Sequence, residues 1–383
     1  MRVLHTSDWH LGRSLGDHRL LEDQAAFCDW LVGFVAGEKI DLVAVSGDLF
    51  DRSIPPGDAW TLLCDVFSRL RSAGATVAAI AGNHDSAGRL AALDDLLNGA
   101  GVYLRGGYAR AGSVTELDLG GHPLALVTTP FLDPHMAPSE VAEPLREASA
   151  LSHEGVLALA MHGARSAMPD GIPSMVLSHA FVTGAARSDS ERELAVGEAA
   201  MVSAEVFSGF DYVALGHLHQ PQSVAGEERI RYSGSPLPYS FSETGPKSVC
   251  IAELDEAGLV GVTSVEVPVG RSVVTVRGTL EDLAESAGDA RNFVRAELTD
   301  ELRPVDAARL LRSSFPWLAE VEWVGGRRDG IQGLSVSEVA VRTPGELVDD
   351  FWRDVRGERP GEEVRAMLHG ALHGTDTGEF AAA

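Results

Sequence analysis

Lysine is nearly absent from this chain of 383 residues. Lys39 and Lys247 are the only two, so arginine supplies almost all of the 31 basic side chains, against 56 acidic ones and a formal net charge of −25. Affinity for nucleic acids comes largely from cationic side chains that neutralise phosphates. The composition therefore argues against tight DNA binding by the isolated chain. A DNA substrate would need locally placed arginines, which favour bidentate phosphate contacts, or a partner that supplies positive surface.

Cysteines are few, and long apolar runs are missing. Cys28, Cys64 and Cys250 are odd in number and widely spaced in apolar surroundings, which predicts buried free thiols rather than disulfides or metal ligands. No apolar run approaches the length of a membrane span, and the chain enters its first expected strand without a charged leader. We therefore expect a cytoplasmic protein. The length and the 45% hydrophobic content predict one large domain and at least one smaller one.

Four short polar motifs lie in order along the first 219 residues. They are Asp8-Trp9-His10, Gly47-Asp48-Leu49-Phe50-Asp51, Gly82-Asn83-His84-Asp85 and Gly216-His217-Leu218-His219. Each motif alone is weak, because such short patterns arise by chance, but all four in this order are not expected by accident. They contain the carboxylate, imidazole and amide groups that bind metal ions.

Each of these motifs follows an apolar segment of strand length. The segments are residues 2–6, 42–46, 76–81 and 212–215. In open α/β sheets, ligands bind beyond the carboxyl ends of the strands. We therefore expect the four motifs to converge on one site.

The remaining pattern predicts an α/β chain of three parts. Helices are expected over 20–35, 58–71, 86–97 and 153–168, a hairpin over 114–129, and a short strand over 175–177 that ends at Ser178-His179. Short strands over 222–267 indicate a second and more antiparallel sheet region. A compact segment then alternates strands and helices, with strands over 273–277, 292–298 and 319–324 and helices over 279–287 and 304–313. Two more helices, over 344–355 and 361–372, follow a glycine-rich connector. We therefore divide the chain into domains at 1–269, 270–330 and 331–383.

The motif residues suit a pair of hard divalent ions such as Mn²⁺. Two ions a few ångströms apart need a carboxylate that bridges them, and Asp48 is the natural bridge. Asp8 and His10 lie two residues apart just past a strand and can reach the same ion, and His217 and His219 repeat that spacing. The motifs contain no cysteine, which argues against a structural zinc site.

Four further residues complete the predicted site, and one histidine is excluded from it. Asn83 offers a neutral amide oxygen, and His179 follows its strand as the other ligands follow theirs, so both are predicted metal ligands. His84 would project beside the metals as a general acid, with Asp51 accepting a hydrogen bond from its other ring nitrogen. The alternatives for His84 are another metal ligand or a turn residue. His5 precedes Asp8 inside the first strand and is expected to be a core residue.

Two other groups of residues could bind partners. Arginines near the motifs are candidate contacts to a DNA backbone, with ordinary surface arginine as the alternative; they are Arg13, Arg52, Arg89 and Arg187. Apolar residues at helical spacing in the tail predict partner docking, with packing on their own domain as the alternative; they are Leu347, Phe351, Val355, Val364, Leu368 and Leu372.

The run from residue 1 to about 238 resembles the calcineurin-like metallophosphoesterases. The resemblance lies in HTSDWHLGRS, SGDLFDRSIPP, AGNHDS, LSHAFVTGA, DYVALGHLHQPQ and YSGSPLPYSFSE. HTSDWHLG and YSGSP favour the SbcD branch, which comprises the nuclease subunits of bacterial SbcCD complexes. The likeness extends into the β-α-β-α-β segment and weakens in about the last forty residues.

The resemblance implies a two-sheet α/β/β/α sandwich with a small β-α-β-α-β capping domain, C-terminal helices and two Mn²⁺ ions. By motif position, one ion would be held by Asp8, His10, Asp48 and His219, and the other by Asp48, Asn83, His179 and His217. His84 matches the family's general acid, and Asp51 matches its orienting partner. The branch also implies a homodimer built on the helices near 58–71 and 86–97, and a coiled-coil ATPase of the SbcC type bound by the C-terminal helices.

Three hypotheses about function follow. In the first, the chain is a DNA exo- and endonuclease that cleaves phosphodiester bonds by two-metal hydrolysis as the catalytic part of an SbcCD-type complex. In the second, the same metal core acts on a small phosphoester, which the acidic net charge favours. In the third, the chain is a scaffold whose metal site has decayed, but the full set of ligand and acid residues argues against it.

Overall fold

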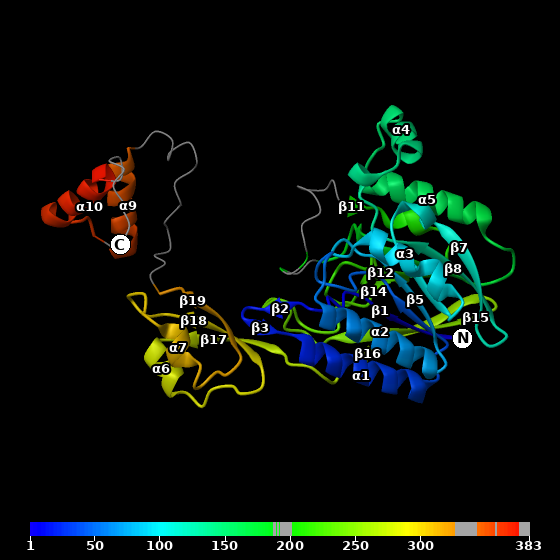
Figure 1. Ribbon diagram of the computed structural model, residues 1–383, viewed down its shortest axis with the longest axis horizontal. Helices are drawn as coiled ribbons and strands as arrows, with labels where there is room; N and C mark the ends of the chain where they lie inside the picture. Colours follow the sequence, from blue (N-terminus) through cyan, green and yellow to red (C-terminus); the bar gives the residue numbers. More distant parts are fainter. Residues whose placement is uncertain (187–188, 190, 192–200, 326–342, 357, 375–383) are drawn as a thin grey trace.

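Two six-stranded sheets lie face to face at the centre of the protein (Figure 1). The computed structural model describes residues 1–186, 189, 191, 201–325, 343–356 and 358–374. The first sheet has the order β16 (Gly258–Glu266), β15 (Ser248–Asp255), β1 (Arg2–Thr6), β4 (Leu42–Val45), β5 (Thr76–Ile80) and β6 (Val102–Arg105). The second has the order β13 (Gln222–Val224), β14 (Glu227–Tyr232), β12 (Tyr212–Gly216), β9 (Ser174–His179), β8 (Pro123–Thr129) and β7 (Ser113–Asp118).

Helices cover the outer face of each sheet. The first sheet carries α1 (Leu21–Glu38), α2 (Gly57–Ser72) and α3 (Ala87–Asn98), and the second carries α5 (His153–Ala167), with α4 (Ser139–Glu147) beyond it (Figure 1). Successive residues of a strand point to opposite faces. Thus Val3 packs between the sheets, whereas Leu4 packs against the helices. The predicted α/β/β/α sandwich is confirmed.

The parallel pairing of the central strands positions the site. In the first sheet β1, β4, β5 and β6 run parallel, and in the second β8, β9, β12 and β14 run parallel. Their carboxyl ends therefore lie at shared edges. The hydroxyl of Ser46 donates to the Ala214 carbonyl at 2.9 Å, which joins the ends of β4 and β12 across the two sheets.

The strands of residues 222–267 pair mostly antiparallel, as predicted, but they do not form a second sheet region of their own. β13 and β14 join the second sheet, whereas β15 and β16 join the first, where β15 pairs antiparallel with β1. The alternation of apolar residues identified these strands as strands. It carries no information about which sheet a strand joins, because either sheet buries the same pattern.

The prediction for the cysteines also needs one correction. Cys28 and Cys250 are buried free thiols, as expected, but Cys64 is free and exposed. On α2 the core-facing residues are Ala59, Leu63, Val66, Phe67 and Leu70. Position 64 lies between members of that series and faces outward.

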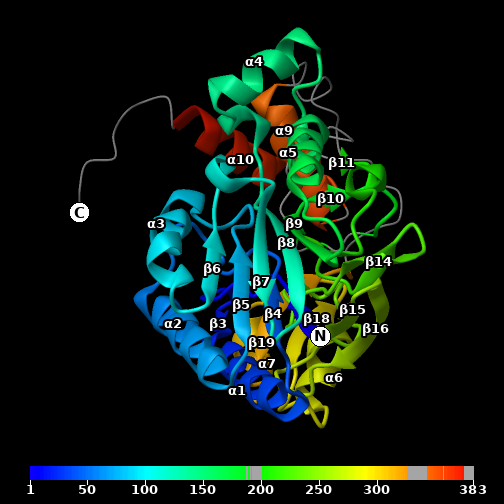
Figure 2. The same ribbon diagram turned by 90° about the vertical axis from the view of Figure 1, so that its right-hand side faces the viewer.

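A third, smaller sheet forms the module that follows the sandwich. β17 (Val273–Gly278), β18 (Phe293–Leu298) and β19 (Leu318–Trp323) pair in parallel, with α6 (Leu280–Glu285) and α7 (Ala307–Leu311) as the crossovers. The β-α-β-α-β order is confirmed. The module lies at the end of the molecule away from α4 in both views (Figures 1 and 2).

A hydrophobic cluster joins this module to the sandwich. It contains Leu15, Leu20, Leu237, Tyr239, Phe241, Val273 and Phe293. Beside it, Arg271 pairs with Asp23 of α1 at 2.5 Å and lies over the Trp317 ring. The small sheet is therefore anchored to the sandwich by both apolar and ionic contacts.

Two helices, α9 (Pro344–Arg356) and α10 (Glu362–Gly374), end the described chain and lie apart from the sandwich in Figure 1. They are joined to each other by Asp349, which pairs with Arg365 at 2.6 Å and with His369 at 3.0 Å. Among the described residues, no helix combines the length and the apolar character needed to cross a membrane.

Candidate metal centre

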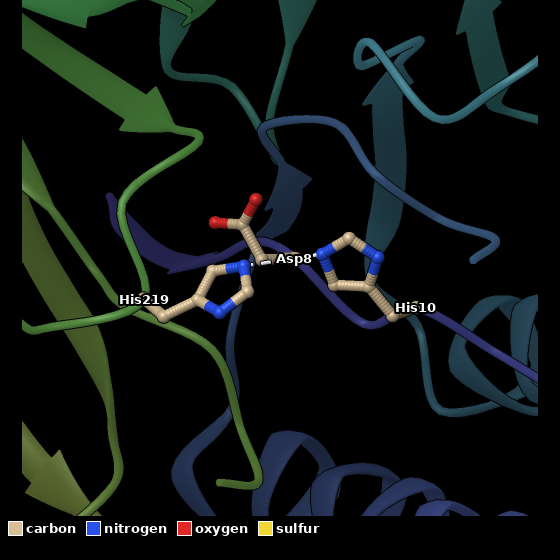
Figure 3. Close-up of side chains that lie close together, drawn as sticks. All are labelled: Asp8, His10 and His219. Carbon is tan, nitrogen blue, oxygen red and sulfur yellow. Dashed lines mark hydrogen bonds between the residues drawn. The ribbon is translucent and has the colours of Figure 1, made fainter. Parts of the chain in front are cut away.

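The loops after β1, β4, β5, β9 and β12 bring the predicted ligands together. Three overlapping groups have donor atoms within 4.8 Å of one another: Asp8, His10 and His219; Asp8, Asp48 and His179; His10, Asp48 and His84. Figure 3 shows the first group, which comes from two loops far apart in the sequence. Except for His84, these side chains are buried, so a cation among them would be held mainly by protein atoms.

Asp48 lies at the centre of this constellation. Its Oδ2 atom is 3.5 Å from Nε2 of His10 and 3.6 Å from Nε2 of His179, while Oδ1 accepts a hydrogen bond from the main-chain N–H of His84 at 2.9 Å. The carboxylate thus faces one histidine from each of the two predicted ligand sets. This is the arrangement that a bridging carboxylate requires.

His10 and His219 face each other at the first predicted ion position. Their Nε2 atoms are 3.2 Å apart, as the dashed line in Figure 3 shows. Two imidazole nitrogens at that distance can form a hydrogen bond only if one carries the proton. A divalent cation between them would accept both lone pairs, and Asp8 adds a carboxylate nearby. The residues present therefore fit a metal ion.

Asn83 occupies the corresponding place at the second predicted position. Its Oδ1 atom lies 2.9 Å from Nε2 of His179 and 3.2 Å from Nδ1 of His217. The amide oxygen is therefore surrounded by imidazole nitrogens from β9 and from the loop after β12. Together with Asp48, this set offers oxygen and nitrogen donors without sulfur.

His84 is held at the rim of the site by a main-chain contact. Its Nδ1 atom donates to the carbonyl oxygen of Asp51 at 2.8 Å, whereas the carboxylate of Asp51 accepts from Arg13 at 3.3 Å. Asp51 thus contacts His84 as expected, but through its backbone rather than its side chain. The His84 ring is also close enough to His10 and Asp48 to be a ligand, so its role as an acid stays a prediction.

The site loops have an unusual backbone. Of the eight non-glycine residues with positive φ in the described part of the chain, four are predicted ligands: Asp8 (55°), His10 (44°), Asp48 (50°) and His217 (111°). Such conformations cost free energy and persist only where neighbouring contacts enforce them. Here the main-chain N–H of Asp8 donates to the Gly47 carbonyl at 3.0 Å, and that of His10 donates to the Asp48 carbonyl at 2.9 Å. The main-chain N–H of His217 donates to the Asp8 carboxylate at 3.1 Å. The loops therefore hold one another.

Asp85 is a site residue whose role the sequence did not show. Its carboxylate accepts hydrogen bonds from the main-chain N–H groups of Leu49, Phe50 and Gly82 at 2.9–3.0 Å. Burial raises the pKa of Asp85, and the charge of Asp48 adds to this effect, giving a pKa of about 7. The residue joins the loop after β4 to the loop after β5. In the sequence it looks like an ordinary turn aspartate.

A methyl group at Gly82 should disrupt the centre. A Cβ atom there would overlap Oδ1 and the main-chain nitrogen of Asp48, whereas a Cβ atom at Gly88 would meet nothing within 4 Å. Because a displacement of about 1 Å can cost about 100-fold in rate, we expect Gly82→Ala to weaken the binding of divalent ions and to slow any reaction that depends on them by at least that factor. Calorimetric Mn²⁺ titration and initial rates would measure both. Gly88→Ala is the control, and equal behaviour of the two variants would contradict the steric argument.

Glu243 and Lys247 form a second set of site residues that the motifs did not reveal. Lys247 is ion-paired with Glu243 and also donates to Ser235 Oγ at 2.9 Å and to His219 O at 3.1 Å. Oε1 of Glu243 is 3.3 Å from Nδ1 of His219. Burial alone would raise the pKa of Glu243, but the contacts with His219 and Lys247 outweigh it and lower the pKa to about 2. Glu243 is the last residue of the YSGSPLPYSFSE segment, and the base four residues after it was the only further signal in the sequence.

His5 is a core residue, as predicted. Its side chain is completely buried, with Nδ1 3.0 Å from Tyr212 Oη and Nε2 3.1 Å from Leu215 O. Burial lowers its pKa to about 3. Both ring nitrogens therefore have partners away from the metal centre.

Comparison with known proteins agrees with this geometry. Residues 1–221 match the calcineurin-like phosphoesterase family. The curated SbcD component of the nuclease SbcCD from Escherichia coli K12 is 30% identical over 293 residues, which cover 74% of this chain and 72% of that protein. Its namesake from Bacillus subtilis 168 is 36% identical over 258 residues (66% of each chain), and that from Staphylococcus epidermidis is 27% identical over 361 residues (93% of each chain). With more than half of its residues matched and the family's motifs gathered in one buried centre, the chain belongs to the calcineurin-like phosphoesterase family and is a metal-dependent phosphoesterase.

Proposed function

We propose that the protein is a Mn²⁺-dependent DNA exo- and endonuclease and the catalytic component of an SbcCD-type complex. The observation that carries the two-metal chemistry is the position of Asp48 Oδ2, 3.5 Å from His10 Nε2 and 3.6 Å from His179 Nε2. The relatives named as SbcD components of the nuclease SbcCD support the choice of DNA as substrate.

In this proposal seven side chains hold two divalent ions. One set is Asp8, His10, Asp48 and His219, and the other is Asp48, Asn83, His179 and His217. Asp8, His10 and His219 of the first set have donor atoms within 4.8 Å of one another, and Oδ1 of Asn83 lies 2.9 and 3.2 Å from imidazole nitrogens of the second, which supports this assignment. When bound, the ions supply Lewis acidity at the phosphate and lower the pKa of the attacking water.

His84 provides the proton for the departing sugar oxygen. Because the carbonyl of Asp51 can only accept, Nδ1 of His84 carries a hydrogen. The acid would therefore be the imidazolium form, in which Nε2 carries the second proton and releases it to the departing oxygen. The same bond fixes the ring at the rim of the site. Asp51 therefore acts as the orienting residue through its main chain, while its carboxylate holds Arg13.

Three of the four candidate DNA-binding arginines gather around residues 51–53. Arg13 and Arg52 lie 3.3 and 3.9 Å from the Asp51 carboxylate, and Arg89 donates to Ser53 O at 3.1 Å. Arg187 lies outside the described residues. These arginines beside His84 support a path for the phosphate backbone there, despite the net charge of −25.

The outer elements suggest how the protein assembles. Exposed apolar side chains lie on the terminal helices, where Phe351 is 69% and Met367 is 74% exposed, and near α2 and α3, where Ile54 is 68% and Leu96 is 77% exposed. We assign the first pair to a coiled-coil ATPase of the SbcC type and the second to a homodimer contact. Val355 belongs to the predicted tail stripe, but its side chain lies outside the described part. Such a complex would work on DNA in the cytoplasm.

The predicted three-part division gives each part a role. Residues 1–269 would form the nuclease, residues 270–330 would cap the DNA site, and residues 331–383 would bind the partner. The contact between the β17–β19 sheet and Tyr239, which lies beside His10 and His219, supports a capping position.

A two-substrate assay tests this proposal. We expect the Mn²⁺-loaded protein to cleave linear duplex DNA, and bis(p-nitrophenyl) phosphate reports the competence of the metal centre independently. Turnover of the small ester without cleavage of DNA, with or without the ATPase partner, would favour a small-molecule phosphodiesterase. Metal-loaded protein that cleaves neither substrate would favour the scaffold hypothesis. Co-purification with a large coiled-coil ATPase would support the assignment of the partner.

A further inference from the structure

The buried carboxylate of Glu243 contacts Nδ1 of His219, the ring nitrogen that does not face the metal site. Nδ1 of His219 lies 3.3 Å from Oε1 of Glu243, and Nε2 of the same ring lies 3.2 Å from Nε2 of His10. The Glu243 side chain is completely buried. The ring is thus held at one nitrogen and presents the other to the neighbouring ligands.

Lys247 fixes both this carboxylate and the main chain of His219. Its ammonium group is ion-paired with Glu243 and donates to Ser235 Oγ at 2.9 Å and to His219 O at 3.1 Å, so all three N–H donors have acceptors. The Lys247 side chain is only 9% exposed. One ammonium group therefore restrains His219 from two directions.

The stability of the fold is a poor explanation for this ion pair. Removing two charges from water costs free energy that their attraction often fails to recover, so apolar side chains of similar size would serve stability equally well. The pair lies against a predicted metal ligand, since Oε1 of Glu243 is 3.3 Å from Nδ1 of His219. Its direct contact with His219 is therefore the feature that needs an explanation.

We propose that Glu243 is a positioning residue for metal binding: it accepts the Nδ1 proton of His219 and so keeps the Nε2 lone pair directed at the ion, while Lys247 holds Glu243 in place. This inference rests on the proposed role of His219 as a metal ligand. Carboxylates that orient a ligating histidine typically contribute about 10- to 100-fold to metal affinity. The effect should be confined to the ion bound by Asp8, His10, Asp48 and His219.

Two double variants separate positioning from charge and folding. Glu243→Gln with Lys247→Met, and Glu243→Leu with Lys247→Met, both remove the ion pair without leaving one buried charge alone. Glutamine keeps an acceptor for the Nδ1 hydrogen, whereas leucine does not. In calorimetric Mn²⁺ titrations we expect the leucine variant to bind one of two ions about 10- to 100-fold more weakly, and the glutamine variant to stay close to the wild type. Equal affinities in the two variants would overturn the proposal.

Wild-type and control measurements distinguish this inference from the proposed function. Glu266 lines the same surface hollow as Glu243 and is exposed, so Glu266→Gln is the matched control and should bind both ions normally. Wild-type protein that binds no pair of ions would contradict the proposed function itself. Two tight ions in the wild type and in the leucine variant would overturn only the role of Glu243.

A spectroscopic test requires no change at Glu243. In the ¹⁵N spectrum of histidine-labelled, metal-free protein, with the His219 resonances assigned by comparison with His219→Gln, we expect the proton on Nδ1 and none on Nε2. A proton on Nε2 would mean that this nitrogen has no lone pair available for the ion. That result would overturn the proposal even if the leucine variant failed to fold.

Discussion

His84→Ala should lower the turnover of DNA by about 10²- to 10⁴-fold, the usual contribution of a general acid, while metal and DNA binding stay intact. Binding should survive because the group that holds the Asp48 carboxylate at 2.9 Å is the main-chain N–H of His84, which alanine retains. The side chain is held through Nδ1 by Asp51 O, at the rim of the site. Single-turnover cleavage at saturating Mn²⁺, together with the Mn²⁺ stoichiometry, measures the two quantities.

The leaving group provides the discriminating control. A p-nitrophenolate leaving group needs little protonation, so hydrolysis of bis(p-nitrophenyl) phosphate should suffer much less in His84→Ala than cleavage of DNA. His135→Ala, at an exposed position, should leave both reactions unchanged. If His84→Ala bound one ion fewer than the wild type, His84 would be a metal ligand. If the variant cleaved DNA at a near-normal rate, His84 would not be the general acid.

Asp48→Ala should abolish binding of both ions and reduce cleavage to the background rate. Its Oδ2 atom lies close to both His10 and His179, so the variant removes a ligand from each set at once. Each filled site stabilises the folded protein by about 2.7 kcal/mol when the ion is at 100 times its Kd. The rise in Tm on adding Mn²⁺ to the wild type should therefore vanish in the variant.

The metal-free protein supplies the folding control for this variant. Burial raises the pKa of Asp8 and of Asp85, and the charge of Asp48 raises both further, so removing Asp48 relieves repulsion that offsets its lost hydrogen bond. The Tm without metal should thus change little. Asp29→Ala, at a side chain that is 67% exposed, is the neutral comparison. If Asp48→Ala still bound one ion tightly, Asp48 would not be the bridge.

The predictable part of the site is the part that depends on strand ends. An apolar segment followed by a polar motif occurs at β1, β4, β5, β9 and β12, and parallel pairing brings those ends together. Asp8, Asp48 and His179 accordingly lie within one group of donor atoms. Short continuous apolar runs also predicted the central strands of the sandwich, and helical spacing predicted its main helices.

The rest could not be predicted, for identifiable physical reasons. The contact of Asp51 with His84 uses a main-chain carbonyl, which every residue possesses, so the letter at position 51 does not reveal it. Glu243 and Lys247 lie well beyond the end of β14 at Tyr232 rather than directly after it, and only the fold places them beside His219. Asp85 accepts from one main-chain N–H of its own loop and two of the loop after β4, a role that no local pattern encodes.

The position of β15 limits how far the catalytic unit can be shortened. The segment that matches the family ends at residue 221, yet β15 (Ser248–Asp255) lies inside the first sheet, between β1 and β16. A fragment cut at 221 would leave β1 as a bare edge, whose unpaired N–H and C=O groups invite aggregation. It would also lack the loop that supports His219. The smallest self-sufficient nuclease core must therefore run at least through Asp255, the end of β15, so chain topology rather than motif content sets its length.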